Sequence, residues 1–224
     1  MTLIDFRVSP KTVQQVTVEK LRQAIITGVF KPGDRLLEAE LCELLGVSRP
    51  SVREALRSLE AERLVAIVPN KGPHIPRLTW DQATEIYKVR ALLEGEAASL
   101  AAQNATEESI KKMRVALSVF EKAARGADAA AEVNSTADFY AEILRSCNNS
   151  IIEEVLGGLL ARVNFLRARS MSMPGRAKVS LKEMKSILDS IEARDSEAAR
   201  RAAIHHVEQA YASAHEAYKR AQLE

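Results

Sequence analysis

The segment from Ser48 to Leu59, SRPSVREALRSL, constrains the fold most, because it combines a helix start with two separate stripes of side chains. Ser48 is a good helix N-cap, and Pro50 falls in the first turn, where its missing N–H costs nothing. An apolar stripe has the spacing of a helix docked on a core and consists of Val52, Ala55, Leu56 and Leu59. A basic stripe, about 110° around the helix, consists of Arg49, Arg53 and Arg57. We expect a short helix with one buried face and one basic face.

Such a helix suits the major groove of DNA, because its N-terminal amides and hydroxyls can meet phosphates while its arginines reach base edges. The alternative is an ordinary surface helix with solvated arginines. The upstream sequence favours DNA, since residues 38–45 predict another short helix and Gly46 follows where a positive φ is cheap. The two helices and the tight turn between them predict a helix-turn-helix, preceded by a helix that ends near Gly28.

A β-type pattern follows the helix-turn-helix. Residues 64–68 form a short run of strand-favouring residues, and His74-Ile75 form a second. The tip between them contains Asn70, Lys71 and Gly72. Two strands around this tip would form a wing, with Lys71 and the bare backbone of Gly72 at a minor groove or at phosphates.

Residues 12–76 resemble the winged-helix domain of GntR-family bacterial transcription regulators. The matching segments are Ala24 to Leu36, Leu45 to Leu56 and Leu59 to Val65. The resemblance implies DNA contacts at the following residues: Ser48, Arg49, Ser51, Arg53, Lys71 and Gly72. Two positions depart from the family. Ala39 removes an arginine that other members can use for a base contact, and Arg63 replaces the glycine that usually ends the recognition helix. An arginine in the left-handed conformation costs about 1–2 kcal/mol, so we expect a different helix end.

Composition agrees with this interpretation without establishing it. The chain has 224 residues, enough for one or two domains. Residues 1–77 contain 12 Lys and Arg against 9 Asp and Glu, an excess too small to prove DNA binding. The start of the chain does not resemble a signal peptide, and no apolar run approaches a membrane span. The isolated Cys42 and Cys147 suggest a reduced, cytoplasmic protein.

Helical periodicity dominates the rest of the chain. We therefore predict a mainly α protein with two domains: a winged helix-turn-helix in residues 1–76 and an antiparallel all-helical bundle in residues 77–224. Capping boxes at Thr79 and at Ser150 predict the starts of two of its helices. We find no internal repeat and no low-complexity segment.

Two polar residues fall on inward stripes of these predicted helices. Arg90 lies in the middle of an apolar face, so it needs an anionic partner. That partner could be a ligand or a glutamate of a neighbouring helix. His206 lies on the inward stripe of the last helix and is either a hydrogen-bonded core residue or part of a binding site.

The helical region resembles the FCD effector domain of FadR-type GntR regulators. The matching segments are Val89 to Ala102, Asp138 to Ile152 and Met184 to Glu208. Many members bind a divalent metal in this domain, and the resemblance places the four ligands at Thr136, Tyr140, Met184 and His206. Hydroxyls are poor ligands for such ions, a thioether prefers soft ions, and one histidine does not make a zinc site. We therefore expect no metal and no other cofactor.

These observations predict a dimeric, DNA-binding transcription regulator, more often a repressor by the resemblance, that binds a two-fold symmetric operator and a small effector. The effector is expected to be anionic, because Arg90 is the one inward-facing positive charge that the sequence reveals. We expect five residues to line one cavity for it: Arg90, Thr136, Tyr140, Met184 and His206. An enzyme in the helical domain is disfavoured by the missing metal ligands and by the absence of a nucleophile–base pair. A protein-interaction module without DNA binding is disfavoured by Ser48, Arg49 and Arg53.

Overall fold

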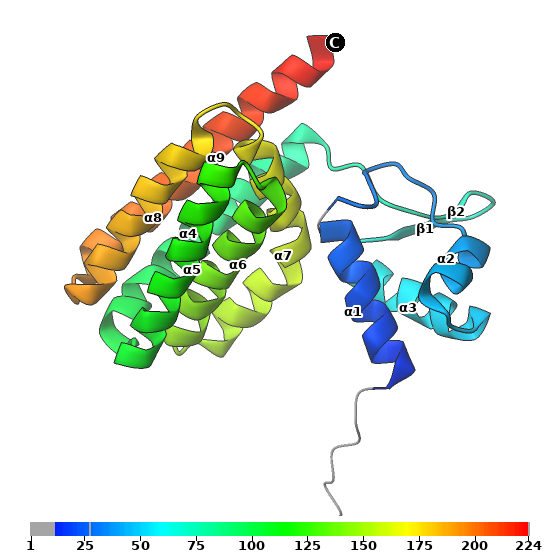
Figure 1. The fold of residues 1–224 in the computed structure, drawn as a ribbon, viewed down its shortest axis with the longest axis horizontal. Helices are drawn as coiled ribbons and strands as arrows, with labels where there is room; N and C mark the ends of the chain where they lie inside the picture. Colours follow the sequence, from blue (N-terminus) through cyan, green and yellow to red (C-terminus); the bar gives the residue numbers. More distant parts are fainter. Residues whose placement is uncertain (1–11, 27, 224) are drawn as a thin grey trace, which may run out of the picture. The chain divides into compact units, whose positions relative to one another are not determined.

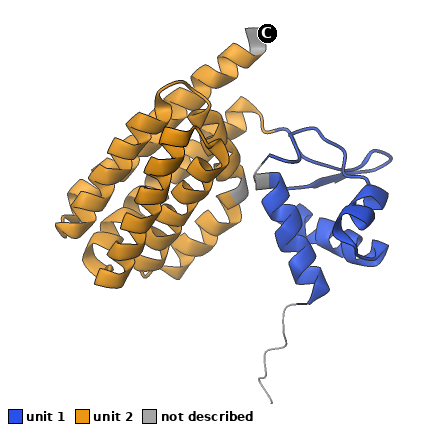
Figure 2. Ribbon diagram, viewed as in Figure 1, with its two compact units in different colours: residues 1–77 blue, residues 78–224 orange. Residues whose placement is uncertain are grey.

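The computed structural model describes residues 12–26 and 28–223, and the chain divides into two compact units (Figure 2). Unit 1 comprises residues 1–77 and unit 2 residues 78–224. The described part of unit 1 contains helices and a two-stranded sheet, whereas that of unit 2 is helical (Figure 1). The predicted fold class is confirmed. No helix in the described part of the chain is both long and apolar enough to cross a membrane.

The helix-turn-helix of unit 1 follows the local sequence signals. Its helices are α1 (Val13–Ile26), α2 (Glu38–Leu45) and α3 (Arg49–Ala61). The turn between α2 and α3 starts at Gly46, whose φ of 65° lies in the left-handed region and whose N–H donates to the carbonyl oxygen of Cys42 at 2.9 Å. The buried face of α3 is the predicted apolar stripe: Val52, Ala55, Leu56 and Leu59.

The carboxyl end of α3 shows how the chain accommodates an arginine where the related domains have glycine. Arg63 has a φ of 57°, in the left-handed region. Its N–H donates to the carbonyl oxygen of Glu60, and the N–H of Leu64 donates to that of Leu59, both at 2.9 Å. This pair of bonds is the Schellman motif. The expectation of a different helix end was therefore wrong, because these two hydrogen bonds hold Arg63 in the conformation that glycine would adopt.

Replacing Arg63 with glycine is expected to raise the free energy of unfolding of unit 1 by roughly 0.5–1 kcal/mol. The relieved left-handed strain exceeds the extra freedom that glycine gives the unfolded chain. Differential scanning calorimetry of the full chain would show a higher transition temperature. Arg57→Gly is the control, because Arg57 is an exposed residue inside α3, where glycine should lower stability by about 1 kcal/mol. Equal losses in both variants would contradict strain at Arg63.

The wing consists of β1 (Ala66–Val68) and β2 (Gly72–His74), paired antiparallel with Ala66 opposite His74 and Val68 opposite Gly72. An isolated bridge joins Arg35 to His74. Both strands differ slightly from the predicted runs. Leu64 and Val65 are buried beside the end of α3 and precede β1, so the first strand is shorter than residues 64–68.

Six helices make up the described part of unit 2: α4 (Trp80–Asn104), α5 (Glu107–Gly126), α6 (Ala129–Ser146), α7 (Ser150–Met171), α8 (Arg176–Glu192) and α9 (Ser196–Leu223). The predicted capping box of α4 is present, with reciprocal hydrogen bonds of 3.2 Å between Thr79 and Gln82. The box predicted at Ser150 is wrong. Asn149 caps α7 instead, because its side-chain oxygen lies one residue earlier and accepts two N–H groups of the first turn.

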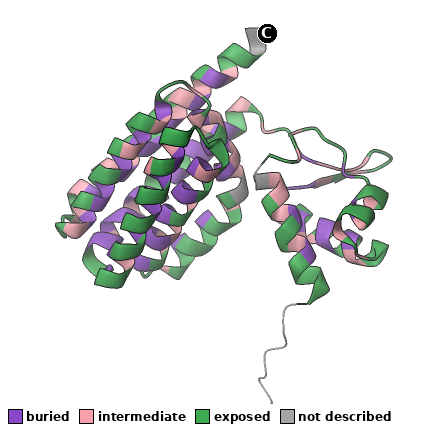
Figure 3. Cartoon of the chain, viewed as in Figure 1, coloured by how far each residue is buried: buried purple, intermediate pink, exposed green. Residues whose placement is uncertain are grey.

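The core of unit 2 forms where α4 lies along α9, with α5, α6 and α8 around them (Figure 3). Small residues allow α4 and α9 to approach closely. A Cβ at Gly95 of α4 would lie 2.7 Å from Cγ1 of Ile204 in α9. The large apolar side chains that fill this core include Phe120, Phe139, Met113 and Ile143. Charged side chains on the same inward faces are therefore enclosed by protein rather than water.

Candidate DNA-binding surface and candidate ligand site

The amino end of α3 carries hydroxyl groups that face solvent. Ser48 is the N-cap, and its Oγ accepts the N–H of Ser51 at 3.4 Å. The two hydroxyl oxygens are 2.9 Å apart. Ser48 and Arg49 are exposed and Ser51 is partly exposed. Because the first-turn N–H groups point out of the same helix end, this arrangement can receive a phosphate.

Arg53 is held in place by a residue that the sequence analysis missed. Its Nε donates to both carboxylate oxygens of Glu38 in α2, at 3.0 and 2.9 Å. This hydrogen bond and the carboxylate charge raise the pKa of Arg53. The Arg53 side chain is still 60% exposed. Glu38 uses only Nε, so the two terminal nitrogens of Arg53 remain for a base edge or a phosphate.

The wing tip adds the remaining predicted contacts. Lys71 is exposed, and Gly72 has a φ of 77°, which favours glycine there. Asn70 also has a positive φ, of 64°. The sequence analysis missed Arg35, whose Nη2 would lie 3.8 Å from a Cβ at Gly72. The wing tip therefore presents a second positive charge beside Lys71.

The five residues predicted to line an effector cavity are all buried, and they come from α4, α6, α8 and α9: Arg90, Thr136, Tyr140, Met184 and His206. Only some of them meet. The rings of Tyr140 and His206 stack with centroids 5.8 Å apart. The hydroxyl of Thr136 donates to the carbonyl oxygen of Glu132 at 2.8 Å, within its own helix.

Arg90 has an internal partner one helical turn away. Its Nε donates to Oε1 of Glu94 at 2.7 Å, and both side chains are buried. Burial alone would lower the pKa of Arg90, but the charge and hydrogen bond of Glu94, together with the nearby phenols of Tyr87 and Tyr140, raise that pKa. Of the two partners considered from sequence, the internal carboxylate is present, although it lies on the same helix. The inference that Arg90 is the one inward positive charge was wrong, because Arg167 and Arg176 are buried too.

A second buried ion pair lies within α8, and His206 of α9 contacts it. Arg176 donates through both terminal nitrogens to the two carboxylate oxygens of Glu183, at 2.8 and 2.7 Å. Nδ1 of His206 lies 2.7 Å from Oε2 of the same carboxylate. Burial alone would raise the pKa of Glu183, but hydrogen bonds from His206 and Arg176 lower it to about 2. Burial lowers the pKa of His206 despite the neighbouring carboxylate, so a neutral imidazole donates to an ionised Glu183.

Unit 2 is expected to lose stability as the pH falls below about 6.5. The unfolded chain takes up a proton at that pH, whereas His206, facing Arg176 and Arg90 as well as Glu183, stays neutral in the folded state. The loss is at most about 1.4 kcal/mol per pH unit for one proton. Urea unfolding at neutral and at mildly acidic pH would measure it. His206→Gln should flatten the dependence, whereas His205→Gln, at an exposed position, should not. Identical pH profiles in both variants would contradict the assignment.

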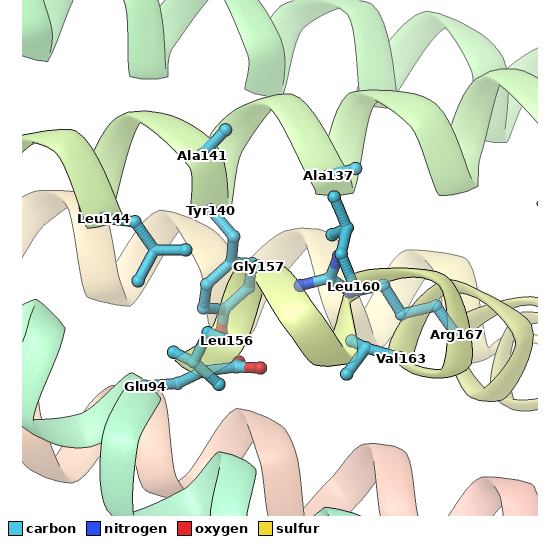
Figure 4. Close-up of a pocket in the computed structure, with 10 residues that line it drawn as sticks. All are labelled: Glu94, Ala137, Tyr140, Ala141, Leu144, Leu156, Gly157, Leu160, Val163 and Arg167. Atoms are coloured by element: carbon cyan, nitrogen blue, oxygen red, sulfur yellow. The ribbon is translucent and has the colours of Figure 1, made fainter. Parts of the chain in front are cut away.

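A cavity of about 60 Å³ lies between α4, α6 and α7 (Figure 4). Its polar lining comes from Glu94, Tyr140 and Arg167, one residue from each helix. The remaining lining is apolar and includes Leu144, Leu156, Leu160 and Val163. Of the five predicted effector residues, Tyr140 alone is among the residues that line this cavity.

The four positions that correspond to metal ligands in the related domains do not fit a divalent ion. The Thr136 hydroxyl is already bonded to a backbone carbonyl oxygen. Burial raises the pKa of Tyr140 well above its usual value, which keeps the phenol protonated. Met184 offers only a thioether, and Nδ1 of His206 is bonded to Glu183. Within residues 12–26 and 28–223, no three His, Cys, Asp or Glu side chains gather as a possible metal site.

Comparison with models of known protein families shows which family the chain belongs to. Residues 6–75 match the model for bacterial regulatory proteins of the gntR family, and residues 85–209 match the FCD domain. The chain belongs to the GntR family. It is a GntR-family transcription regulator with an FCD domain.

Two relatives of this GntR-family chain match over most of their length. The uncharacterized HTH-type transcriptional regulator YdhC of Bacillus subtilis (strain 168) is 30% identical over 188 residues, 84% of each chain. The galactonate operon transcriptional repressor of Escherichia coli (strain K12) is 29% identical over 206 residues, 82% of this chain and 89% of its own. The solved structure of E. coli McbR/YncC has a TM-score of 0.84 at 24% identity, covering 93% of this chain and all of that one, and shows the same fold.

Proposed function

We propose that this GntR-family regulator is a cytoplasmic homodimeric repressor, not an enzyme, whose operator binding is controlled by a small effector in unit 2 without a metal ion. The observation that supports operator binding most directly is the exposed amino end of α3. Ser48 and Ser51 offer hydroxyls there, and Arg53 is pre-oriented by Glu38. Pre-orientation lowers the entropy lost when an arginine binds a base edge.

Repression is supported by the names of two relatives. One is the E. coli galactonate operon transcriptional repressor, and another is the probable D-xylose utilization operon transcriptional repressor of Paenarthrobacter nicotinovorans, 28% identical over 202 residues. A dimer is supported by the small area of DNA that one winged helix can contact. One winged helix buries too little surface for tight specific binding, whereas two copies can read two half-sites of a symmetric operator.

The proposal that no metal ion is bound rests on the side chains at the four positions that hold the metal in related domains. Thr136, Tyr140 and Met184 replace three of the four ligands, and the remaining His206 is engaged by Glu183. Elemental analysis of the purified protein is expected to show no stoichiometric zinc, nickel or manganese. About one bound metal ion per chain, lost in His206→Ala, would overturn this part of the proposal.

A mobility-shift titration with the DNA upstream of its own gene tests the function as a whole. We expect a discrete complex that is competed by the same sequence and not by unrelated DNA. Sedimentation of the free protein should show a dimer at micromolar concentration. A monomer with and without DNA, or binding that does not discriminate between sequences, would contradict the proposal.

A further inference from the structure

Of the three buried arginines of unit 2, only two form an ion pair with a buried carboxylate. Three arginines are at most 4% exposed: Arg90, Arg167 and Arg176. Glu94 neutralises Arg90, and Glu183 neutralises Arg176. Among the described residues, no carboxylate lies at ion-pair distance from Arg167. The third arginine therefore leaves an excess of one positive charge in this part of the core.

The surroundings of Arg167 satisfy its hydrogen bonds only in part. Nη1 donates to the neutral side-chain oxygen of Asn164 at 2.8 Å. The guanidinium lies over the ring of Tyr140, 4.9 Å from the centroid. Nε is buried and has no hydrogen-bond partner. Burial lowers the pKa of Arg167 to about 10, even with Glu94 nearby, so the group is still charged at neutral pH. An uncompensated buried cation is costly, which calls for a counter-ion.

A second unpaired donor borders the same space. The Tyr140 hydroxyl is buried without a hydrogen-bond partner, and its raised pKa keeps it protonated. Figure 4 shows its ring reaching from α6 into the cavity, with Arg167 entering from α7. Glu94 also lines the cavity, but its carboxylate is already bonded by Arg90. A free cation and a free O–H donor thus meet at one cavity.

We propose that this cavity binds the carboxylate of a small organic monoanion, with Arg167 as its counter-ion and the Tyr140 hydroxyl as a second donor. The inference deepens the proposed function and rests on it, because this ligand would be the effector. One negative charge matches the single excess positive charge. A dicarboxylate would add a buried charge without a partner.

The size and lining of the cavity restrict the ligand further. A volume of about 60 Å³ is less than half of the roughly 150 Å³ that accepts benzene in another protein. The ligand therefore has a carboxylate head and a short tail. The tail would lie against Leu144, Leu156 and Leu160, where burying each methylene is favourable.

Thermal unfolding of the full chain with matched small molecules tests the ligand class. Sodium acetate is the probe, and acetamide has nearly the same shape without the charge. Sodium chloride and disodium malonate control for ionic strength and for a second carboxylate. At concentrations up to about 10 mM, which reveal millimolar affinities, acetate should raise the unfolding temperature in a dose-dependent way. Acetamide and chloride should not, and malonate should act more weakly than acetate.

Variants test the anchoring residues. Arg167→Met should weaken acetate binding by about 10- to 150-fold, the range for losing a hydrogen bond to a charged group. Arg169→Met makes the same change on the same helix at a position that does not line the cavity, and should bind acetate like the parent. Tyr140→Phe keeps the ring and should weaken binding by about 2- to 12-fold. If Arg167→Met does not fold, the proposal is tested by Tyr140→Phe and by comparing the carboxylate with its amide on the parent protein.

Three results would overturn this inference: no stabilisation by acetate, equal stabilisation by acetate and acetamide, or unchanged acetate binding in folded Arg167→Met. Mobility shifts with the same proteins separate it from the proposed function. A parent protein that fails to bind its operator counts against the proposed function. A parent that binds operator and responds to a neutral metabolite, while ignoring acetate, overturns the ligand class alone.

Discussion

Glu94→Gln is expected to lower the free energy of unfolding of unit 2 by about 3–5 kcal/mol, the usual cost of removing one partner from a buried ion pair. Glu94 is the carboxylate bonded to Arg90, and it is also the nearest negative charge that moderates the pKa of Arg167. Its loss would leave two buried guanidinium groups without a counter-charge. The amide can still accept one hydrogen bond, but it cannot neutralise either arginine.

Arg90→Met should cost less than Glu94→Gln, because Arg167 remains near the carboxylate that Arg90 leaves behind. The effect of Arg90→Met on stability should also change sign when Glu94 is already replaced by glutamine. In the parent, Arg90→Met breaks an ion pair and destabilises. In the Glu94→Gln background it removes an uncompensated cation and should stabilise, so the double variant unfolds at higher urea than Glu94→Gln alone.

Urea unfolding followed by circular dichroism would measure both effects. Glu142→Gln is the control, because Glu142 is also a buried glutamate, yet its partner Arg145 is 58% exposed and can be solvated after the change. That loss should stay near 1 kcal/mol or below. Equal losses in Glu94→Gln and Glu142→Gln, or additive effects of the two changes at residues 90 and 94, would refute a coupled charge cluster.

Local sequence signals predict unit 1 well because its elements depend on short-range chemistry. The Ser48 cap, the left-handed Gly46 and the apolar stripe of α3 each act within about one helical turn. Arg63 shows the limit of this reasoning. Its intrinsic conformational preference predicts a different helix end, yet two backbone hydrogen bonds and the burial of Leu64 select the left-handed conformation. Tertiary packing here outweighs a local cost of about 1–2 kcal/mol.

The charged core of unit 2 was only partly predictable. Arg167 lies in the arginine-rich end of α7, which looks solvated, but the spacing of buried residues places it on the inward stripe with Ile152, Leu156 and Val163. A stripe analysis of α7 like that of α4 would have found it. Glu183 was missed because it lies beside Met184 at the edge of the apolar face of α8. The choice of partners cannot be deduced from one helix, since it depends on which faces of different helices meet.

Arg53→Ala is expected to weaken binding to the operator by about 5- to 150-fold, the range for a bidentate arginine–base contact. The side chain is exposed on α3, and Glu38 fixes its Nε while leaving both terminal nitrogens available. The loss should be specific to sequence, since a base contact contributes nothing to unrelated DNA. Lys71→Ala at the wing should instead weaken specific and non-specific binding alike and reduce the salt dependence, because a lysine at a phosphate releases counterions.

Glu38→Gln tests how much the orientation of Arg53 by Glu38 contributes to operator binding, apart from the contact of Arg53 with DNA. It keeps a hydrogen-bond acceptor for Nε but removes the charge, so operator affinity should fall less than in Arg53→Ala. Arg57→Ala provides the matched control, because Arg57 is also exposed on α3 and pairs with Glu54 on the same helix. Fluorescence anisotropy with operator and scrambled duplexes, repeated at two salt concentrations, distinguishes the four variants. If Arg53→Ala and Arg57→Ala lose the same affinity for both duplexes, Arg53 acts only through its charge, and the assignment of a base-reading arginine on α3 is wrong.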